Sequence, residues 1–304
     1  MMSSSSSTYD AAEYKFFFFF TSVLFLLVIF LIYFEGSQHK NLKFVKQKKR
    51  QGHTMQNVAF GASSKSQMPR LRTKGEDKNF IKFKTQVEEQ AHQFKDIFFL
   101  EALKTQKKVA LTFDDGPDLT FTPEILEVLK SYGIKATFFL VGFKIQRHPE
   151  VVEKMLEEGH IIGNHSYSHL DFEKLSMEEM FDKQVQRNES LMRDGFDVQP
   201  IFIRPPYGKI TNEQVLYLAN KGYKIINWSI DTYDWQKEQT SEQIADSVMR
   251  HIHDGAIILL HSGGENKQNT VKALPDIIAR IRQMGFSIVT VNELLRTPPY
   301  FDKK

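Results

Sequence analysis

Short apolar runs alternate with amphipathic stretches from residue 107 almost to the end of the chain, and this order constrains the fold more than any other feature. The apolar runs have the length of strands, and the stretches between them have the period of helices. Such alternation predicts an α/β fold with a parallel sheet and crossover helices, either doubly wound or closed as a barrel. A series of about seven units favours the barrel, in which functional groups lie at the carboxyl ends of the strands.

The composition fits a folded enzyme and excludes several kinds of site. Of the 304 residues 41% are hydrophobic, and the net charge is only +3 with no basic stripe, so we expect no nucleic-acid partner. Cysteine is absent, which excludes disulfides, thiolate metal sites and cysteine nucleophiles. Any metal must therefore be bound by histidines and carboxylates.

An uncharged apolar run from Phe16 to Phe34 predicts a transmembrane anchor. As a helix, these nineteen residues would span about 28 Å, close to the hydrocarbon thickness of a bilayer. A buried core helix is disfavoured because every face of the run is apolar. A cleaved signal peptide is the closer rival, although the run is longer than is usual for one and no small-residue cleavage pattern follows it.

The chain divides around this run. We expect a short polar tail over residues 1–15, the anchor over 16–34, and a basic polar stalk or linker over 35–95 with one helix near its end. A folded domain is expected over residues 96–304, with its core at 107–296.

Conspicuous polar side chains follow the predicted strands. Because the carboxyl ends of parallel strands meet at one rim, these groups should converge there. Histidines and carboxylates gathered in one place are hard to explain as packing, since such groups are costly to bury unpaired. The residues are Asp114 and Asp115 after the first strand, then His165 and His169, Arg204, Asp231 and Asp234, and His261.

His165 and His169 stand four residues apart in the segment HSYSH. On a helical turn both imidazoles would point the same way and could bind one cation. The spacing alone is weak evidence, because two exposed histidines at the start of a helix would look the same. Asp115 would supply a third ligand and leave a coordination position open for water and substrate, as catalytic zinc requires.

The remaining polar groups could complete a hydrolytic site. Asp114 could accept a proton from water, although the carboxylates of TFDDGP could also simply cap a helix. Arg204, on the stiff RPPYG turn, could hold Asp114 in a bidentate contact. His261 could act as an acid whose proton affinity Asp234 raises, and the alternative is a satisfied core histidine. Trp235 could form an apolar wall of the kind against which sugars stack.

Five ordered motifs, TFDDGP, HSYSH, RPPYG, DTYDW and ILLHS, closely resemble those of the polysaccharide deacetylases, the NodB-homology domain of carbohydrate esterase family four. The resemblance covers residues 107–296 and leaves out the expected anchor and stalk. It implies a distorted (β/α) barrel with fewer than eight units, and an enzyme that removes acetyl groups from N-acetylated sugars by metal-dependent hydrolysis. Ser262 is a minor departure, since many relatives carry an acidic residue there.

The resemblance also implies a role for each motif. The metal is expected to be zinc, or else cobalt or nickel. An Asp-Asp pair is typical of the metal-using branch, because the branch that acts on muramic residues before lactam formation carries asparagine in place of the metal-binding aspartate. The implied roles are general base for Asp114, metal ligands for Asp115, His165 and His169, tether of the base for Arg204, oxyanion-stabilising backbone amide for Tyr207, general acid for His261 paired with Asp234, and acetyl-pocket walls for Trp235 and Leu259.

The substrate is inferred from the expected location. An anchored domain beside the cell envelope favours peptidoglycan N-acetylglucosamine, and chitin or chitooligosaccharides, exopolysaccharides and O-acetylated xylan stay open. The basic stalk could contact anionic wall polymers. An alternative to an enzyme is a sugar-binding protein on a degenerate barrel, which should have lost the metal ligands. A third alternative is a metal-dependent amidase that acts on small cyclic amides, which should lack the RPPYG and DTYDW motifs.

The distribution of basic residues conflicts with this location. They are concentrated between Lys40 and Arg50, after the expected anchor, while only Lys15 precedes it. The positive-inside rule would therefore keep the C-terminal part of the chain in the cytoplasm. Because the polymer substrates of the resembled family lie outside the cell, we expect a single-pass membrane protein with an extracellular catalytic domain.

Overall fold

The computed structural model describes residues 78–103 and 107–303. The expected transmembrane run over residues 16–34 and most of the expected stalk lie outside these residues. Among the described helices, none is both long and apolar enough to cross a membrane.

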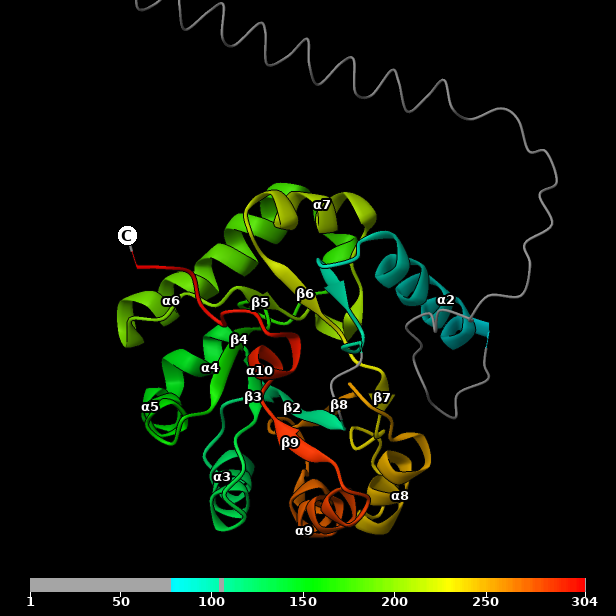
Figure 1. Ribbon diagram of the computed structural model, residues 1–304. Coiled ribbons are helices and arrows are strands. Elements are labelled where there is room, and N and C mark those ends of the chain that lie inside the picture. The colour runs from blue at the N-terminus through cyan, green and yellow to red at the C-terminus, as the bar shows by residue number, and fades with distance from the viewer. Residues whose placement is uncertain (1–77, 104–106, 304) are drawn as a thin grey trace, which may run out of the picture. The chain divides into compact units, whose positions relative to one another are not determined.

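A parallel sheet runs through the described part of the chain, and its strands curl into half a barrel (Figure 1). The strand order is β1-β6-β5-β4-β3-β2-β8-β7, and β9 also pairs with β2. The predicted α/β class with parallel strands is confirmed. The strands are β1 (Phe98–Phe99), β2 (Lys108–Gly116), β3 (Thr137–Leu140), β4 (Ile161–Asn164), β5 (Phe202–Ile203), β6 (Lys224–Ile226), β7 (Ile230–Asp231), β8 (Ile257–His261) and β9 (Ser287–Val289).

The helices that connect these strands lie around the outside of the sheet (Figure 1). Two of them, α7 and α8, begin with a capping box in which a threonine and a glutamine three residues later satisfy each other's backbone N–H groups. A π-helical stretch, Glu179–Gln186, leads directly into α6. The helices are α2 (Lys78–Gln93), α3 (Phe121–Ser131), α4 (Gly142–Arg147), α5 (Pro149–Glu157), α6 (Arg187–Phe196), α7 (Asn212–Asn220), α8 (Ser241–His251), α9 (Gln268–Gln283) and α10 (Val291–Leu295).

Side chains of β2 alternate between two faces of the sheet. Leu111 and Phe113 belong to an apolar cluster shared with the helices that cover the outer face, whereas Ala110 belongs to a second cluster on the inner face. The period of two therefore directs Asp114 to the inner face as well. Because β2 pairs with β8 in a register that places Asp114 opposite His261, both polar side chains lie at the same rim.

The helix α2 belongs to the folded unit that contains the sheet. Val87, Ala91 and Phe94 are buried and join the inner apolar cluster. Residues 78–93 fall within the stalk expected from the sequence, yet in the structure they pack against the body of the domain. The sequence did not predict this buried face, because the segment is polar and Gln-rich and one of the buried residues is itself a glutamine, Gln90.

Candidate active site

Most of the residues predicted from the motifs line one pocket of about 660 Å³ at the carboxyl ends of the strands. Arg204 and Asp234 lie buried behind it, where each contacts a lining residue. The pocket also takes in residues without a predicted role. The predicted lining residues are Asp114, Asp115, His165, His169, Tyr207, Trp235, Leu259 and His261, and the additional ones are Phe80, Phe83, Lys209, Trp228 and Asp231.

Asp114 is held by Arg204, whose side chain is fully buried. Arg204 Nη1 donates to Asp114 Oδ1 at 2.7 Å and to Thr112 Oγ1 at 2.8 Å. Its Nε and Nη2 donate to the backbone carbonyl oxygens of Ile226 and Asn227. The predicted contact with the base is present, but it is made through one nitrogen and not bidentate, because the other acceptors fix the rest of the guanidinium.

A β-bulge at the end of β2 turns Asp115 toward the pocket. Strict alternation would place Asp115 on the opposite face from Asp114. The register between β2 and β3 shifts between Asp114 and Gly116, and Asp115 has a left-handed φ of 67°. A bulge adds one residue to a strand and re-aims its side chain. Both carboxylates of the Asp-Asp pair therefore face the same pocket.

The histidines follow β4 in an irregular turn, so the helical turn predicted for residues 165–169 is wrong. Ser166 and His169 have left-handed φ values of 66° and 58°. The Ser166 N–H donates to Asn164 Oδ1, and the His169 N–H donates to Ser166 Oγ, each at 2.9 Å. Asn188 Nδ2 donates to the Ser166 carbonyl oxygen at 2.8 Å. These contacts replace helical hydrogen bonds, and the two imidazole centroids still lie 4.9 Å apart.

Asp115, His165 and His169 form a group that fits a divalent metal ion. Their ligand atoms all lie within 4.8 Å of one another. His165 Nδ1 donates to the carbonyl oxygen of Arg204 at 2.7 Å, which leaves the lone pair of Nε2 for a metal ion. The Nε2 atom lies 3.5 Å from Asp115 Oδ1. His169 Nε2 lies 3.2 Å from the same oxygen. A backbone acceptor behind the imidazole is the usual orienting contact of a metal-binding histidine.

The pKa values of Asp115 and His169 also suit metal binding. Burial, together with the nearby His165, lowers the pKa of His169 to about 4, so that its imidazole is neutral near pH 7. Burial would raise the pKa of Asp115, but electrostatic interactions with His165 and with the other basic side chains nearby hold it below its usual value. Neutral imidazoles with a carboxylate are a donor set of catalytic zinc and of other transition metals. The described residues contain no second group of three such side chains.

His261 is paired with the buried Asp234. Its Nδ1 donates to Asp234 Oδ1 at 2.7 Å, and its backbone N–H donates to Oδ2 at 2.8 Å. Thr270 Oγ1 donates to the same Oδ2. Burial disfavours the charged imidazolium, but the Asp234 carboxylate outweighs this and raises the pKa of His261 to about 9. His261 is therefore a protonated group whose Nε2 is left for the pocket.

Aromatic and aliphatic side chains form the walls of the pocket. Tyr207 has a left-handed φ of 59°, and its ring meets that of His169 edge-on at 4.8 Å between centroids. Leu259 is buried, whereas Trp235 is half exposed and its Nε1 donates to Asp231 Oδ1 at 3.4 Å. Burial raises the pKa of Asp231 to about 6. Asp231 begins the DTYDW motif and supports Trp235, a role that the sequence did not predict.

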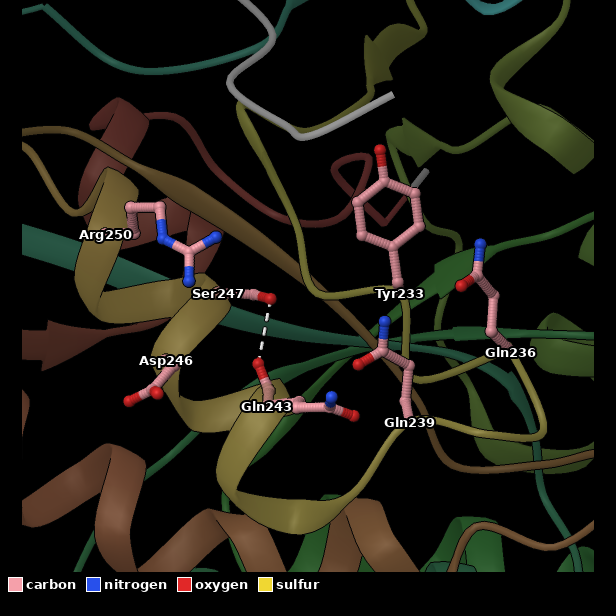
Figure 2. A pocket seen from close by; sticks show the side chains of 7 residues that line it. All are labelled: Tyr233, Gln236, Gln239, Gln243, Asp246, Ser247 and Arg250. Carbon is pink, nitrogen blue, oxygen red and sulfur yellow. Dashed lines mark hydrogen bonds between the residues drawn. The ribbon is translucent and has the colours of Figure 1, made fainter. Parts of the chain in front are cut away.

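A second, smaller hollow of about 290 Å³ adjoins the same loop (Figure 2). Its lining is polar and comes from the loop after β7 and from α8, where Ser247 Oγ donates to the Gln243 carbonyl oxygen at 2.9 Å. The rings of Tyr233, which lines this hollow, and Trp235, which lines the catalytic pocket, lie 5.8 Å apart. The loop after β7 therefore contributes to both.

Known proteins resemble this chain over most of the described residues. Residues 102–226 match the profile of the family described as polysaccharide deacetylase. Two peptidoglycan-N-acetylglucosamine deacetylases of Bacillus cereus are similar. One is 40% identical over 62% of this chain and 69% of its own length, and the other is 37% identical over 64% of this chain and 92% of its own length. The crystal structure of the Bc1960 peptidoglycan N-acetylglucosamine deacetylase superposes with a TM-score of 0.64 at 37% identity, covering 66% of this chain and 94% of that one. The chain therefore belongs to the polysaccharide deacetylase family.

Proposed function

We propose that this hydrolase removes the N-acetyl group from N-acetylglucosamine residues of peptidoglycan, with a divalent metal ion at the site. One observation carries the proposal: Asp114 and His261, side by side on β2 and β8, open into the same pocket as the three-residue metal-binding group. The substrate follows from the Bacillus cereus relatives, whose names specify this sugar.

Asp115, His165 and His169 are the residues that would hold the ion, which we propose to be zinc, with cobalt or nickel as functional substitutes. When bound, such an ion supplies Lewis acidity toward the acetamide carbonyl. The Arg204 carbonyl oxygen keeps His165 in the tautomer that ligation requires, because it fixes the proton on Nδ1.

The proton transfers fall to two side chains. Asp114 accepts a proton from the attacking water, and Arg204 holds the carboxylate in place through a hydrogen bond to Oδ1. His261 donates a proton from Nε2 to the departing amine, since Asp234 occupies Nδ1 and favours the imidazolium. We assign the Tyr207 backbone amide to the developing oxyanion, and Trp235 and Leu259 to the acetyl methyl group.

Polymer assays test the substrate directly. The full 304-residue chain is incubated separately with peptidoglycan, chitooligosaccharides and acetylated xylan in the presence of zinc, and released acetate is measured. We expect the highest kcat/KM on peptidoglycan. A clear preference for chitooligosaccharides or xylan would replace the proposed polymer while leaving the deacetylase chemistry in place.

We further propose that residues 16–34 anchor the enzyme in the cell membrane with the catalytic domain outside, where the basic segment that follows can meet anionic wall polymers. The support is the apolar run itself and the location of the proposed substrate. Protease added to intact cells should degrade the catalytic domain. Protection of the domain until the cells are lysed would place it in the cytoplasm, as the positive-inside rule indicates.

A further inference from the structure

Helix α2 brings two aromatic side chains to the catalytic pocket from outside the part of the chain that matches the family. The family match begins at residue 102, and the shared motifs begin with TFDDGP. Phe80 and Phe83, on the first turns of α2, nevertheless line the pocket together with the metal-binding group. One wall of the active site is therefore built by a segment that family motifs do not describe.

Hydrogen bonds and apolar packing fix α2 in this place. Gln90 is buried, and its Nε2 donates to the Ile210 carbonyl oxygen at 2.7 Å. One turn earlier, Gln86 Nε2 donates to Glu173 Oε1 at 2.6 Å. Val87, on the same side of the helix, is buried in the inner apolar cluster. The middle of α2 is thus held beside the loops that follow β4 and β5.

The aromatic wall continues from α2 into the body of the domain. The ring centroids of Phe83 and Trp228 lie 6.2 Å apart, and those of Phe80 and Phe83 lie 6.4 Å apart. Gly208 makes room for them: a Cβ atom at this position would lie 2.9 Å from Phe83 Cζ and 2.8 Å from Trp228 Cη2. Phe80 and Phe83 are only half-buried, so parts of their rings face the pocket.

Such a wall matches the chemistry of a β-linked amino-sugar chain. Equatorial ring substituents leave the two faces of each pyranose covered by C–H groups, and aromatic rings bind such apolar faces. Sugar sites combine these platforms with a few polar groups that fix orientation. The proposed function assigns the acetyl methyl group to Leu259 and Trp235, which also line the pocket. The pocket-facing parts of the Phe80 and Phe83 rings can therefore contact a different part of the polymer.

Building on the proposed function, we propose that Phe80 and Phe83 form a sugar-binding subsite that stacks against the pyranose ring next to the one being deacetylated. The subsite makes the enzyme selective for oligomers over single N-acetylated sugars. Phe80 and Phe83 are specificity residues in this account, since they act on binding and not on proton transfer.

Two measurements on the full 304-residue chain test the subsite. The first is the ratio of kcat/KM for tetra-N-acetylchitotetraose to that for the methyl glycoside of N-acetylglucosamine, which has no neighbouring ring. The second is the Kd of the tetramer measured by calorimetry. In the F80A/F83A double variant we expect the ratio to fall, and the Kd to rise, by about tenfold, through a higher KM with little change in kcat.

Control variants separate binding from folding. Ile81→Ala removes an exposed side chain from the same turn of α2, and should leave both quantities unchanged. Phe83→Tyr keeps the aromatic platform and should restore both to near the wild-type values. A wild-type ratio and Kd in F80A/F83A would overturn the subsite.

The same measurements distinguish a failure of the proposed subsite from a failure of the proposed function. If the wild-type chain releases no acetate but binds the tetramer in a manner that depends on Phe80 and Phe83, the subsite stands and the proposed function fails. If the wild-type chain is active and its tetramer preference does not depend on these residues, the proposed function stands and the subsite fails.

Discussion

Asp114 pairs in register with His261, accepts a hydrogen bond from the buried Arg204 and lines the pocket. Arg204 donates to it through a single nitrogen, while Thr112 and two backbone carbonyls take the remaining guanidinium contacts. The orientation of Arg204 therefore does not depend on Asp114 alone. The carboxylate that we propose as the proton acceptor can therefore be replaced without removing the other contacts that hold Arg204.

Asp114→Asn is expected to retain the metal and to lose turnover. The amide oxygen can still accept from Arg204 Nη1, but the amide cannot take a proton from water, so kcat should fall by at least about 100-fold. Acetate release and metal content measured on the same sample check both halves of the prediction. Asp276→Asn, an exposed change on α9, serves as the control. An active, metal-loaded Asp114→Asn variant would remove Asp114 from its assigned role.

Asp234→Asn is expected to move the alkaline limb of the pH–kcat profile to lower pH. His261 donates only while protonated, so activity is lost as the pH rises through its pKa, which Asp234 holds at about 9 against the effect of burial. Without the carboxylate, burial remains and the pKa falls. The limb should move down by more than about one pH unit. An unchanged limb would show that another group supplies the proton.

At the scale of elements, the ends of β2, β4 and β8 arrange the site. The bulge at Asp115 brings it beside Asp114, and the turn after β4 aims both histidines at it. Gly263, just after β8, allows this close approach, because a Cβ there would lie 2.1 Å from the Asp115 carbonyl oxygen. Local backbone geometry, more than the strands themselves, positions the metal-binding group.

A pair of glycine substitutions tests whether the close approach of Gly263 holds Asp115 in place. Gly263→Ala should displace Asp115, lowering both metal affinity and the free energy of unfolding. Gly195→Ala, at an exposed position of α6 with no atom within 4 Å of the new Cβ, should stabilise the protein by about 0.5–1 kcal/mol. Denaturant unfolding and zinc titration of both variants check the prediction. Equal effects of the two changes would mean that the β8 end does not constrain Asp115.

The sequence predicts the parallel α/β class and the rim on which the polar residues gather, because the hydrophobic period indicates strands and helices and the motifs follow the strands. It does not predict how Asp115 reaches that rim, since strict alternation sends it to the other face and a bulge depends on contacts with β3. It also misassigns HSYSH, because Asn188, far away in the chain, holds that turn. The sequence also does not predict the buried face of α2, because the polar residue Gln90 is part of that face.

At the scale of the whole molecule, the pocket joins residues from Phe80 on α2 to His261 on β8. Asp114 and Asp115 lie on β2, His165 and His169 follow β4, and His261 ends β8, so the folded sheet is needed to assemble them. A bound ion would tie the ends of β2 and β4 together through Asp115, His165 and His169. Metal binding should therefore affect both activity and stability.

Chelation is expected to abolish acetate release and to lower the melting temperature. Adding zinc, cobalt or nickel back should restore both, whereas magnesium, which prefers oxygen ligands, should not. Activity assays and thermal unfolding of the chelated and reloaded protein provide the test. Full activity in a preparation that elemental analysis shows to be free of metal would rule out metal dependence.

The most direct test of the whole account is mass spectrometry of muropeptides from peptidoglycan treated with the zinc-loaded full chain. The account predicts loss of acetyl groups from N-acetylglucosamine and not from N-acetylmuramic acid, and no loss with Asp114→Asn. Acetyl loss confined to N-acetylmuramic acid, or equal loss with the variant, would contradict it.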